Sequence, residues 1–188
     1  VQQSKVYVEN NEASMAKTAA GFGNVTLSPI HGAMMAAAIA NDGRMVEPRI
    51  VEKIFIDGRE AYNFGKKEGL AGFSHITAEK LRQMMQKTVT SGTARHAFYT
   101  RRGQAYLKDM VVGGKTGSLE GHDPQGDYSW FIGMAPLDDP EIAIAALVIN
   151  RPAWQIKAPF VAREGLLTYF NNKEMNSAKE KLKVASLR

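Results

Sequence analysis

Cysteine is absent from this sequence, and so are long apolar runs. A chain without cysteine has no disulfide bonds, no cysteine nucleophile and no thiolate metal site, although its cellular compartment stays open. No stretch approaches the about 18 consecutive apolar residues that a membrane-spanning helix needs, and no signal-peptide pattern begins the chain. We therefore expect no membrane-spanning segment within these 188 residues.

Histidine is also scarce, which bears on metal chemistry. The four histidines are widely spaced, and none belongs to an H-E-x-x-H motif or a similar pair of ligands. We therefore expect neither a metal site nor any other cofactor. These histidines are His31, His75, His96 and His122.

The excess of positive charge is modest, because 24 Lys and Arg residues against 19 Asp and Glu residues give a net charge of +5. The basic residues gather in residues 95–108 and 173–188. Neither cluster has the interleaved aromatic residues of a single-strand binder or a recognition-helix motif. Solvated faces explain these clusters better than a nucleic-acid partner does.

The composition that is present, with 44% hydrophobic residues, 17 glycines and 7 prolines, is typical of a globular chain with a core. Residues 1–20 are polar and weakly periodic, as is typical of a loop or of the cut edge of a domain. Ser28-Pro29 predicts the start of a helix, which is expected to stop at the stretch from Asn41 to Gly43. Residues 48–64 predict a β-hairpin that turns at Asp57-Gly58.

The second half of the chain predicts two helices around a group of strands. Thr77 is the expected N-cap of a helix that ends at Gly92, and a final helix is expected over residues 157–170, followed by a fraying tail. A short polar connection between the last two strands favours antiparallel neighbours. The order of elements predicts an α+β fold, an antiparallel β-sheet covered by helices. The expected strands span residues 110–118, 128–135 and 141–150.

The segment from Val111 to Ser118, which reads Val-Val-Gly-Gly-Lys-Thr-Gly-Ser, carries the clearest chemistry. On a strand, Lys115 followed by the hydroxyl of Thr116 can hold a carboxylate, while the glycines let a substrate backbone lie close to the strand edge. The Ser118 amide can point at a developing oxyanion if that edge is unpaired. A Walker A loop is excluded, because its spacing requires glycine where the chain has Asp109.

Three further segments support this interpretation through their order along the chain. They are residues 21–29 with the Ala40-Asn41-Asp42-Gly43 stretch, residues 89–94 with Gly92-Thr93-Ala94, and residues 130–136. Together with the K-T-G strand they resemble the transpeptidase domain of penicillin-binding proteins. The sequence is thus similar to the C-terminal part of a peptidoglycan D,D-transpeptidase domain over residues 1–171, followed by a charged tail over residues 172–188.

The resemblance implies roles for the residues of the K-T-G strand. Lys115 and Thr116 would help to bind the carboxylate of a D-Ala-D-Ala stem peptide or of a β-lactam. The Ser118 amide would supply one arm of the oxyanion hole, and Gly114 and Gly117 would keep the strand edge open. The resemblance also implies an extracytoplasmic location, on the periplasmic or cell-surface face of the inner membrane, with anchoring only through a missing N-terminal part.

The family also needs a serine nucleophile in S-x-x-K and an S-x-N element, both upstream of K-T-G. Ser14-Met15-Ala16-Lys17 fits S-x-x-K but ends only 4 residues before Gly21, and S-x-N occurs nowhere in the sequence. Tyr169-Phe170-Asn171 imitates a Y-x-N variant on the wrong side of K-T-G. We interpret the first match as coincidental and expect an upstream part of the same protein, cut off before Val1, to supply the nucleophile; the chain alone is expected to be inactive.

Two alternatives stay open. A catalytically dead module that binds peptidoglycan or a partner would carry the same strand without a nucleophile, and a reading frame that starts near Val1 would favour it. Serine β-lactamases and β-lactam sensors also carry K-T-G, although residues 21–29 and the Gly92-Thr93-Ala94 turn argue for the transpeptidases.

Overall fold

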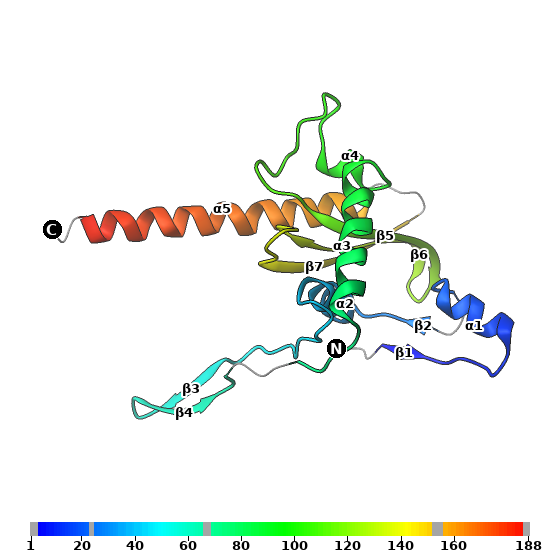
Figure 1. Cartoon of the computed structure of the whole chain (residues 1–188), viewed down its shortest axis with the longest axis horizontal. Helices are drawn as coiled ribbons and strands as arrows, with labels where there is room; N and C mark the ends of the chain where they lie inside the picture. Colours follow the sequence, from blue (N-terminus) through cyan, green and yellow to red (C-terminus); the bar gives the residue numbers. More distant parts are fainter. Residues whose placement is uncertain (1–3, 23–24, 66–68, 152–155, 186–188) are drawn as a thin grey trace.

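The structure, a computed structural model, describes residues 4–22, 25–65, 69–151 and 156–185. A three-stranded antiparallel sheet lies at its centre, a long C-terminal helix extends to one side, and a β-hairpin projects away from the sheet (Figure 1). In chain order the elements are β1 (Lys5–Val6), α1 (Glu12–Ala19), β2 (Val25–Thr26), α2 (Pro29–Ala40), β3 (Lys53–Ile56), β4 (Arg59–Asn63), α3 (His75–Thr90), α4 (Arg95–Phe98), β5 (Gly113–His122), β6 (Gln125–Ala135), β7 (Ile142–Asn150) and α5 (Ala158–Ala185).

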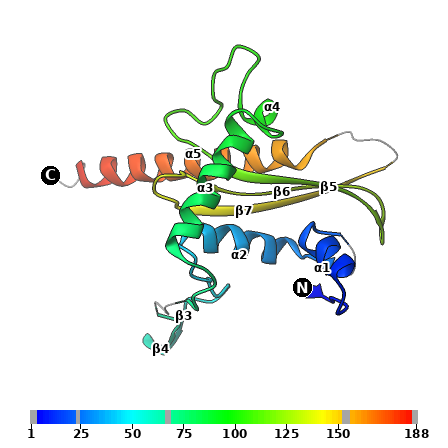
Figure 2. The ribbon, with the colours of Figure 1, turned by 45° about the vertical axis from the view of Figure 1, so that its right-hand side comes forward.

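The central sheet has the strand order β5-β6-β7, and both pairings are antiparallel. Figure 2 shows α5 along one face of this sheet and α2 along the other, with α3 crossing near the β5 edge. Phe131 on β6 lies opposite Thr116 on β5 and Ala146 on β7, which aligns the three strands in register. The predicted α+β class, with an antiparallel sheet covered by helices, is confirmed.

Each face of the sheet has its own apolar core. On the α5 side, Phe131 is fully buried among residues that include Phe98 and Leu166. On the α2 side, Ala36, Met85 and Met134 form a smaller cluster. Because successive residues of a strand point to opposite faces, β6 contributes to both clusters and is fixed between the two helix layers.

Helix α2 follows its sequence signals closely. The Ser28 hydroxyl accepts a hydrogen bond from the His31 amide at 3.3 Å, and Pro29 occupies the first turn, as predicted. A Cβ on Gly32 would lie 3.0 Å from the Ile132 side chain. The glycine therefore lets the helix lie directly against the sheet.

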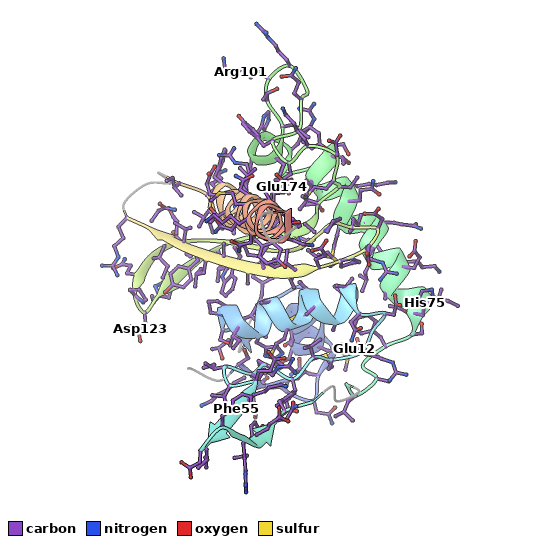
Figure 3. All side chains as sticks on the ribbon, turned by 90° about the vertical axis from the view of Figure 1, so that its left-hand side faces the viewer. Glu12, Phe55, His75, Arg101, Asp123 and Glu174 are labelled. Carbon is purple, nitrogen blue, oxygen red and sulfur yellow. The ribbon has the colours of Figure 1, made fainter. Side chains whose placement is uncertain are left out.

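The hairpin of β3 and β4 turns at Asp57 and Gly58, as predicted, and both residues have positive φ angles, of 50° and 76°. Its first strand begins at Lys53 rather than at residue 48. Phe55, labelled in Figure 3, lies on this hairpin, away from the central sheet, and is 60% exposed. The hairpin is thus a peripheral arm and not part of the core.

Two expectations near helix starts are wrong. Residues 1–20 were expected to form a loop, but the Asn11 side chain accepts from the Ser14 amide and starts α1 at Glu12. Helix α1 has only 8 residues, and none of them is buried. Helix α3 is capped by Ser74 rather than by Thr77, whose amide donates to the Ser74 hydroxyl.

The strand and tail boundaries also differ from the expectations. Strand β5 begins at Gly113, later than residue 110, and continues past Ser118 to His122. Helix α5 continues to Ala185, so the expectation that the charged tail frays is wrong for these residues. The short link between β6 and β7 does join antiparallel neighbours, as predicted.

Candidate functional site

Strand β5 is an edge strand, and no strand pairs with its outer side among the described residues. Lys115 lies opposite Ile132 and therefore on the α2 face, whereas Thr116 lies opposite Phe131 on the α5 face. Ser118 follows Thr116 by two residues, so it shares the same face and directs its main-chain groups to the same edge. One short stretch of β5 thus carries an ammonium group on one face and two hydroxyl groups on the other.

The Lys115 side chain is exposed and bends back along its own strand. Its Nζ donates a hydrogen bond to the main-chain oxygen of Thr116 at 2.6 Å. An ammonium group has three N–H donors, so two remain for an incoming carboxylate. Lys115 is therefore placed to bind an anion beside the strand while it stays tethered to it.

The Thr116 hydroxyl lies 2.7 Å from the hydroxyl of Thr93, a residue of the turn between α3 and α4. This contact joins two segments that are 23 residues apart in the sequence. From the sequence, the turn around Thr93 is recognisable only as one of the family segments. The structure adds that this turn touches the K-T-G strand.

The two glycines of the motif, Gly114 and Gly117, differ in how closely other atoms approach their backbone. A Cβ on Gly114 would lie 2.2 Å from the Phe131 ring, and one on Gly117 would lie 3.2 Å from the Trp130 Cβ. At Gly114 the space next to the backbone is therefore occupied by a buried aromatic ring. The space next to Gly117 is less restricted than that next to Gly114, and the strand is half-exposed at Gly117.

The strand partner of Ser118 has a structural task that sequence reasoning missed. Ser129 lies opposite Ser118 and is 3% exposed. Its hydroxyl accepts a hydrogen bond of 2.9 Å from the Ala158 amide, in the first turn of α5. Ser129 therefore ties the C-terminal helix to the middle of the sheet, behind the candidate site.

The Ala40-to-Gly43 stretch, one of the family segments, is held by Arg82 of α3. The Arg82 guanidinium donates to the main-chain oxygens of Ile39 and Ala40 at 3.1 and 3.4 Å and to the Asp42 carboxylate at 2.8 Å. The hydrogen bond from Arg82, and a smaller effect of His75, hold the pKa of Asp42 below its usual value. This network joins the end of α2 to α3, which in turn packs along β5.

The serine of the S-x-x-K match sits at the start of α1. The Ser14 hydroxyl accepts a hydrogen bond from the Glu9 amide at 3.1 Å, while its own amide donates to the Asn11 side chain. These are bonds of a helix N-terminus. In the Y-x-N match, Phe170 packs into the α5-side core.

A shallow hollow of about 360 Å³ lies at the far end of the β5–β6 hairpin, away from Lys115. Its lining mixes acidic and basic side chains, including Glu120, Asp127 and Arg151.

Within the described ranges, no group of three or more His, Asp or Glu residues is arranged to hold a metal ion. In the same ranges, every helix is too short or too polar to cross a membrane. Gly23 and Asn24 of the family segment at residues 21–29 lie outside the described residues.

Comparison with known proteins identifies a family that covers most of the chain. The family model described as the penicillin binding protein transpeptidase domain matches residues 2–163. The chain is 30% identical over 142 residues to the peptidoglycan D,D-transpeptidase PbpA of Mycolicibacterium smegmatis, covering 72% of this chain and 27% of that protein. It is 31% identical over 144 residues to stage V sporulation protein D of Bacillus subtilis, covering 72% of this chain and 21% of that protein.

Solved structures of penicillin-binding proteins also match this chain. Penicillin-binding protein A of M. tuberculosis, solved as an imipenem acyl-enzyme complex, superposes with a TM-score of 0.68 at 27% identity. That match covers 85% of this chain and 35% of the solved chain. The chain therefore spans about a quarter of the length of these curated relatives and about a third of this structure.

Proposed function

This chain belongs to the penicillin-binding protein transpeptidase family, and from that membership we propose that it forms the carboxylate-binding and oxyanion-binding part of a peptidoglycan D,D-transpeptidase. Its substrate would be a stem peptide that ends in D-Ala-D-Ala, and β-lactams would bind at the same place. The observation that carries the proposal is the open edge of β5 with Lys115 and Thr116 beside it.

The chemistry assigns a separate task to each of these groups. The Lys115 ammonium and the Thr116 hydroxyl would bind the terminal carboxylate of the substrate, which fixes the scissile carbonyl near the strand. The Ser118 amide would donate to the oxygen of that carbonyl as it becomes an oxyanion. Gly117 would let the substrate lie against the strand, and at Gly114 the lack of a side chain also makes room for Phe131.

Acyl transfer further requires a serine nucleophile, whose attack on the carbonyl forms an acyl-enzyme and releases D-alanine. Ser14 is a poor candidate, because its hydroxyl accepts a hydrogen bond in the first turn of α1. We propose that an upstream part of the same protein supplies the nucleophile and the S-x-N element, so the 188-residue chain alone is inactive. That upstream part would also anchor the protein on the extracytoplasmic face of the membrane.

The unpaired outer edge of β7 supports the proposal that a further segment of the protein completes the sheet. Its residues alternate between the α5 face, where Ile144 and Val148 pack, and the α2 face, where Ala143 packs. No charged residue or proline interrupts the strand from Ile142 to Asn150, and no strand pairs with its outer side within the described part. Such an apolar edge is normally covered in a folded protein.

The proposal is tested in the full-length protein with a fluorescent penicillin. Lys115→Ala and Thr116→Val should each slow acylation about tenfold or more, since a hydrogen bond to a charged group contributes about 1.5–3 kcal/mol. Lys108→Ala, which removes an exposed lysine before β5, is the matched control and should leave the rate unchanged. Unchanged acylation in both motif variants would remove these residues from the site.

Two further measurements separate the alternatives. The 188-residue chain should not be labelled alone, and a full-length protein that is never labelled would support a catalytically dead binding module. Rapid turnover of nitrocefin by the full-length protein would instead support a β-lactamase.

A further inference from the structure

The hydroxyl pair of Thr93 and Thr116 carries an inference that rests on the proposed function. The two oxygens are 2.7 Å apart, and Thr93 comes from the turn after α3 rather than from β5. We propose that Thr93 is a positioning residue, which orients the Thr116 hydroxyl so that its proton points toward the substrate carboxylate.

The turn that carries Thr93 is held rigidly against the end of α3. The Gly92 amide donates to the Lys87 oxygen at 2.8 Å, and the Ala94 amide donates to the Thr88 oxygen at 3.0 Å. A Cβ on Gly92 would lie 2.8 Å from the Thr88 Cα, so only glycine fits there without a shift. Ala94, which follows Thr93 in the chain, is 1% exposed. The backbone on both sides of Thr93 is therefore fixed, while its own side chain stays exposed at the strand.

The direction of the hydrogen bond follows from the number of protons. A threonine hydroxyl has one proton to donate and two lone pairs that can accept. If Thr116 donates its proton to a carboxylate, it can only accept from Thr93. The order Thr93 to Thr116 to carboxylate is then the only one that satisfies all three groups, and each bond in such a chain strengthens the next.

Without Thr93, the Thr116 hydroxyl would be free to rotate, and part of the binding energy would go into fixing it. Thr93 itself does not touch the substrate in this arrangement. Its effect should therefore depend on the presence of the carboxylate. A merely structural contact between the turn and β5 would show no such dependence.

The experiment uses the full-length protein and two ligands, a penicillin and the methyl ester of its carboxylate. Thr93→Val removes the hydroxyl and nearly keeps the shape of the side chain. We expect the second-order acylation rate for the penicillin to fall about five- to tenfold, in line with one lost hydrogen bond. The rate for the ester should change less than twofold, and Thr93→Ser should restore the rate for the penicillin.

Controls keep the outcome interpretable. Thr88→Val removes the hydroxyl of a half-buried threonine near the end of α3, one that donates to the Met84 oxygen and not to Thr116, and should leave both rates unchanged. Thr93→Ala is a second variant in case valine disturbs the turn. Equal losses for both ligands, or no loss for either, would overturn the role of Thr93. If Lys115→Ala and Thr116→Val also leave penicillin acylation intact, the proposed function fails instead.

Discussion

At the scale of single residues, Gly114 shows how a motif position can serve the core as well as the site. A Cβ there would lie 2.2 Å from Cζ and 2.5 Å from Cε2 of Phe131, whose side chain is fully buried. We expect Gly114→Ala to lower the free energy of unfolding by about 1–3 kcal/mol, because the ring cannot move without disturbing its neighbours. Urea unfolding of the full-length protein measures this change.

The neighbouring motif glycine provides the comparison. A Cβ on Gly117 would lie 3.2 Å from the Trp130 Cβ, a distance that a small shift can relieve. Gly117→Ala should therefore cost less stability than Gly114→Ala. Equal losses of stability in the two variants would contradict the view that Gly114 is required by the packing of Phe131.

At the residue scale, the sequence predicted correctly that the K-T-G residues lie on a strand. Lys115, Thr116 and Ser118 are neighbours in the chain, so their common strand edge follows from strand geometry alone. The contact of Thr93 with Thr116 could not be predicted in this way. It depends on how the end of α3 packs along β5, which no spacing in the sequence encodes.

At the scale of elements, Arg82 connects α2 to α3. Its side chain is only 13% exposed and donates to two carbonyl oxygens at the end of α2, those of Ile39 and Ala40. We expect Arg82→Met to lower the free energy of unfolding by about 2 kcal/mol, since these oxygens lose a charged donor. Arg82→Lys should lose less, because it keeps the charge. A methionine variant as stable as the original protein would show that the helix end is satisfied by other means.

The same connection gives a pH dependence with a definite sign. The Arg82 hydrogen bond lowers the pKa of Asp42 from 3.8, with His75 contributing less, so the carboxylate is more acidic in the folded state. Its stabilising contribution is then complete above pH 3.8 and is lost as the pH falls through the lower folded value. Unfolding of Asp42→Asn and the original protein should differ near neutral pH and converge in strong acid. The difference should be small, because Asp42 is 54% exposed.

Elements with strong local signals were predictable, and those without were not. Ser28-Pro29 started α2 as expected, and Asp57-Gly58 turned the hairpin. Helix α1 was not predicted because it has only 8 residues, too few for a clear helical periodicity, and it buries none of them. The extension of α5 to Ala185 was not predicted, because a charged chain end favours fraying in general, although charged residues are also compatible with an exposed helix.

At the scale of the whole molecule, the order of elements predicted the class of the fold but not the layers. Nothing in the sequence indicated that α2 and α5 would cover opposite faces of one sheet, as Figure 2 shows. That arrangement depends on paired contacts, such as Gly32 against Ile132 on one face and Gly165 against Ile144 on the other. The strand order β5-β6-β7 in turn makes β5 and β7 the two edge strands of the described sheet.

These two edges should behave differently in the full-length protein. Alternate residues of β7 direct their amides away from β6, so these amides have no strand partner in the described part. If the upstream part covers β7, hydrogen exchange should show all amides from Ile142 to Asn150 protected, while alternate amides of β5 near Thr116 exchange faster and slow when a β-lactam is bound. Fast exchange at every second amide of β7 would contradict a covering segment. Protection of β5 before any ligand is added would contradict an open binding edge.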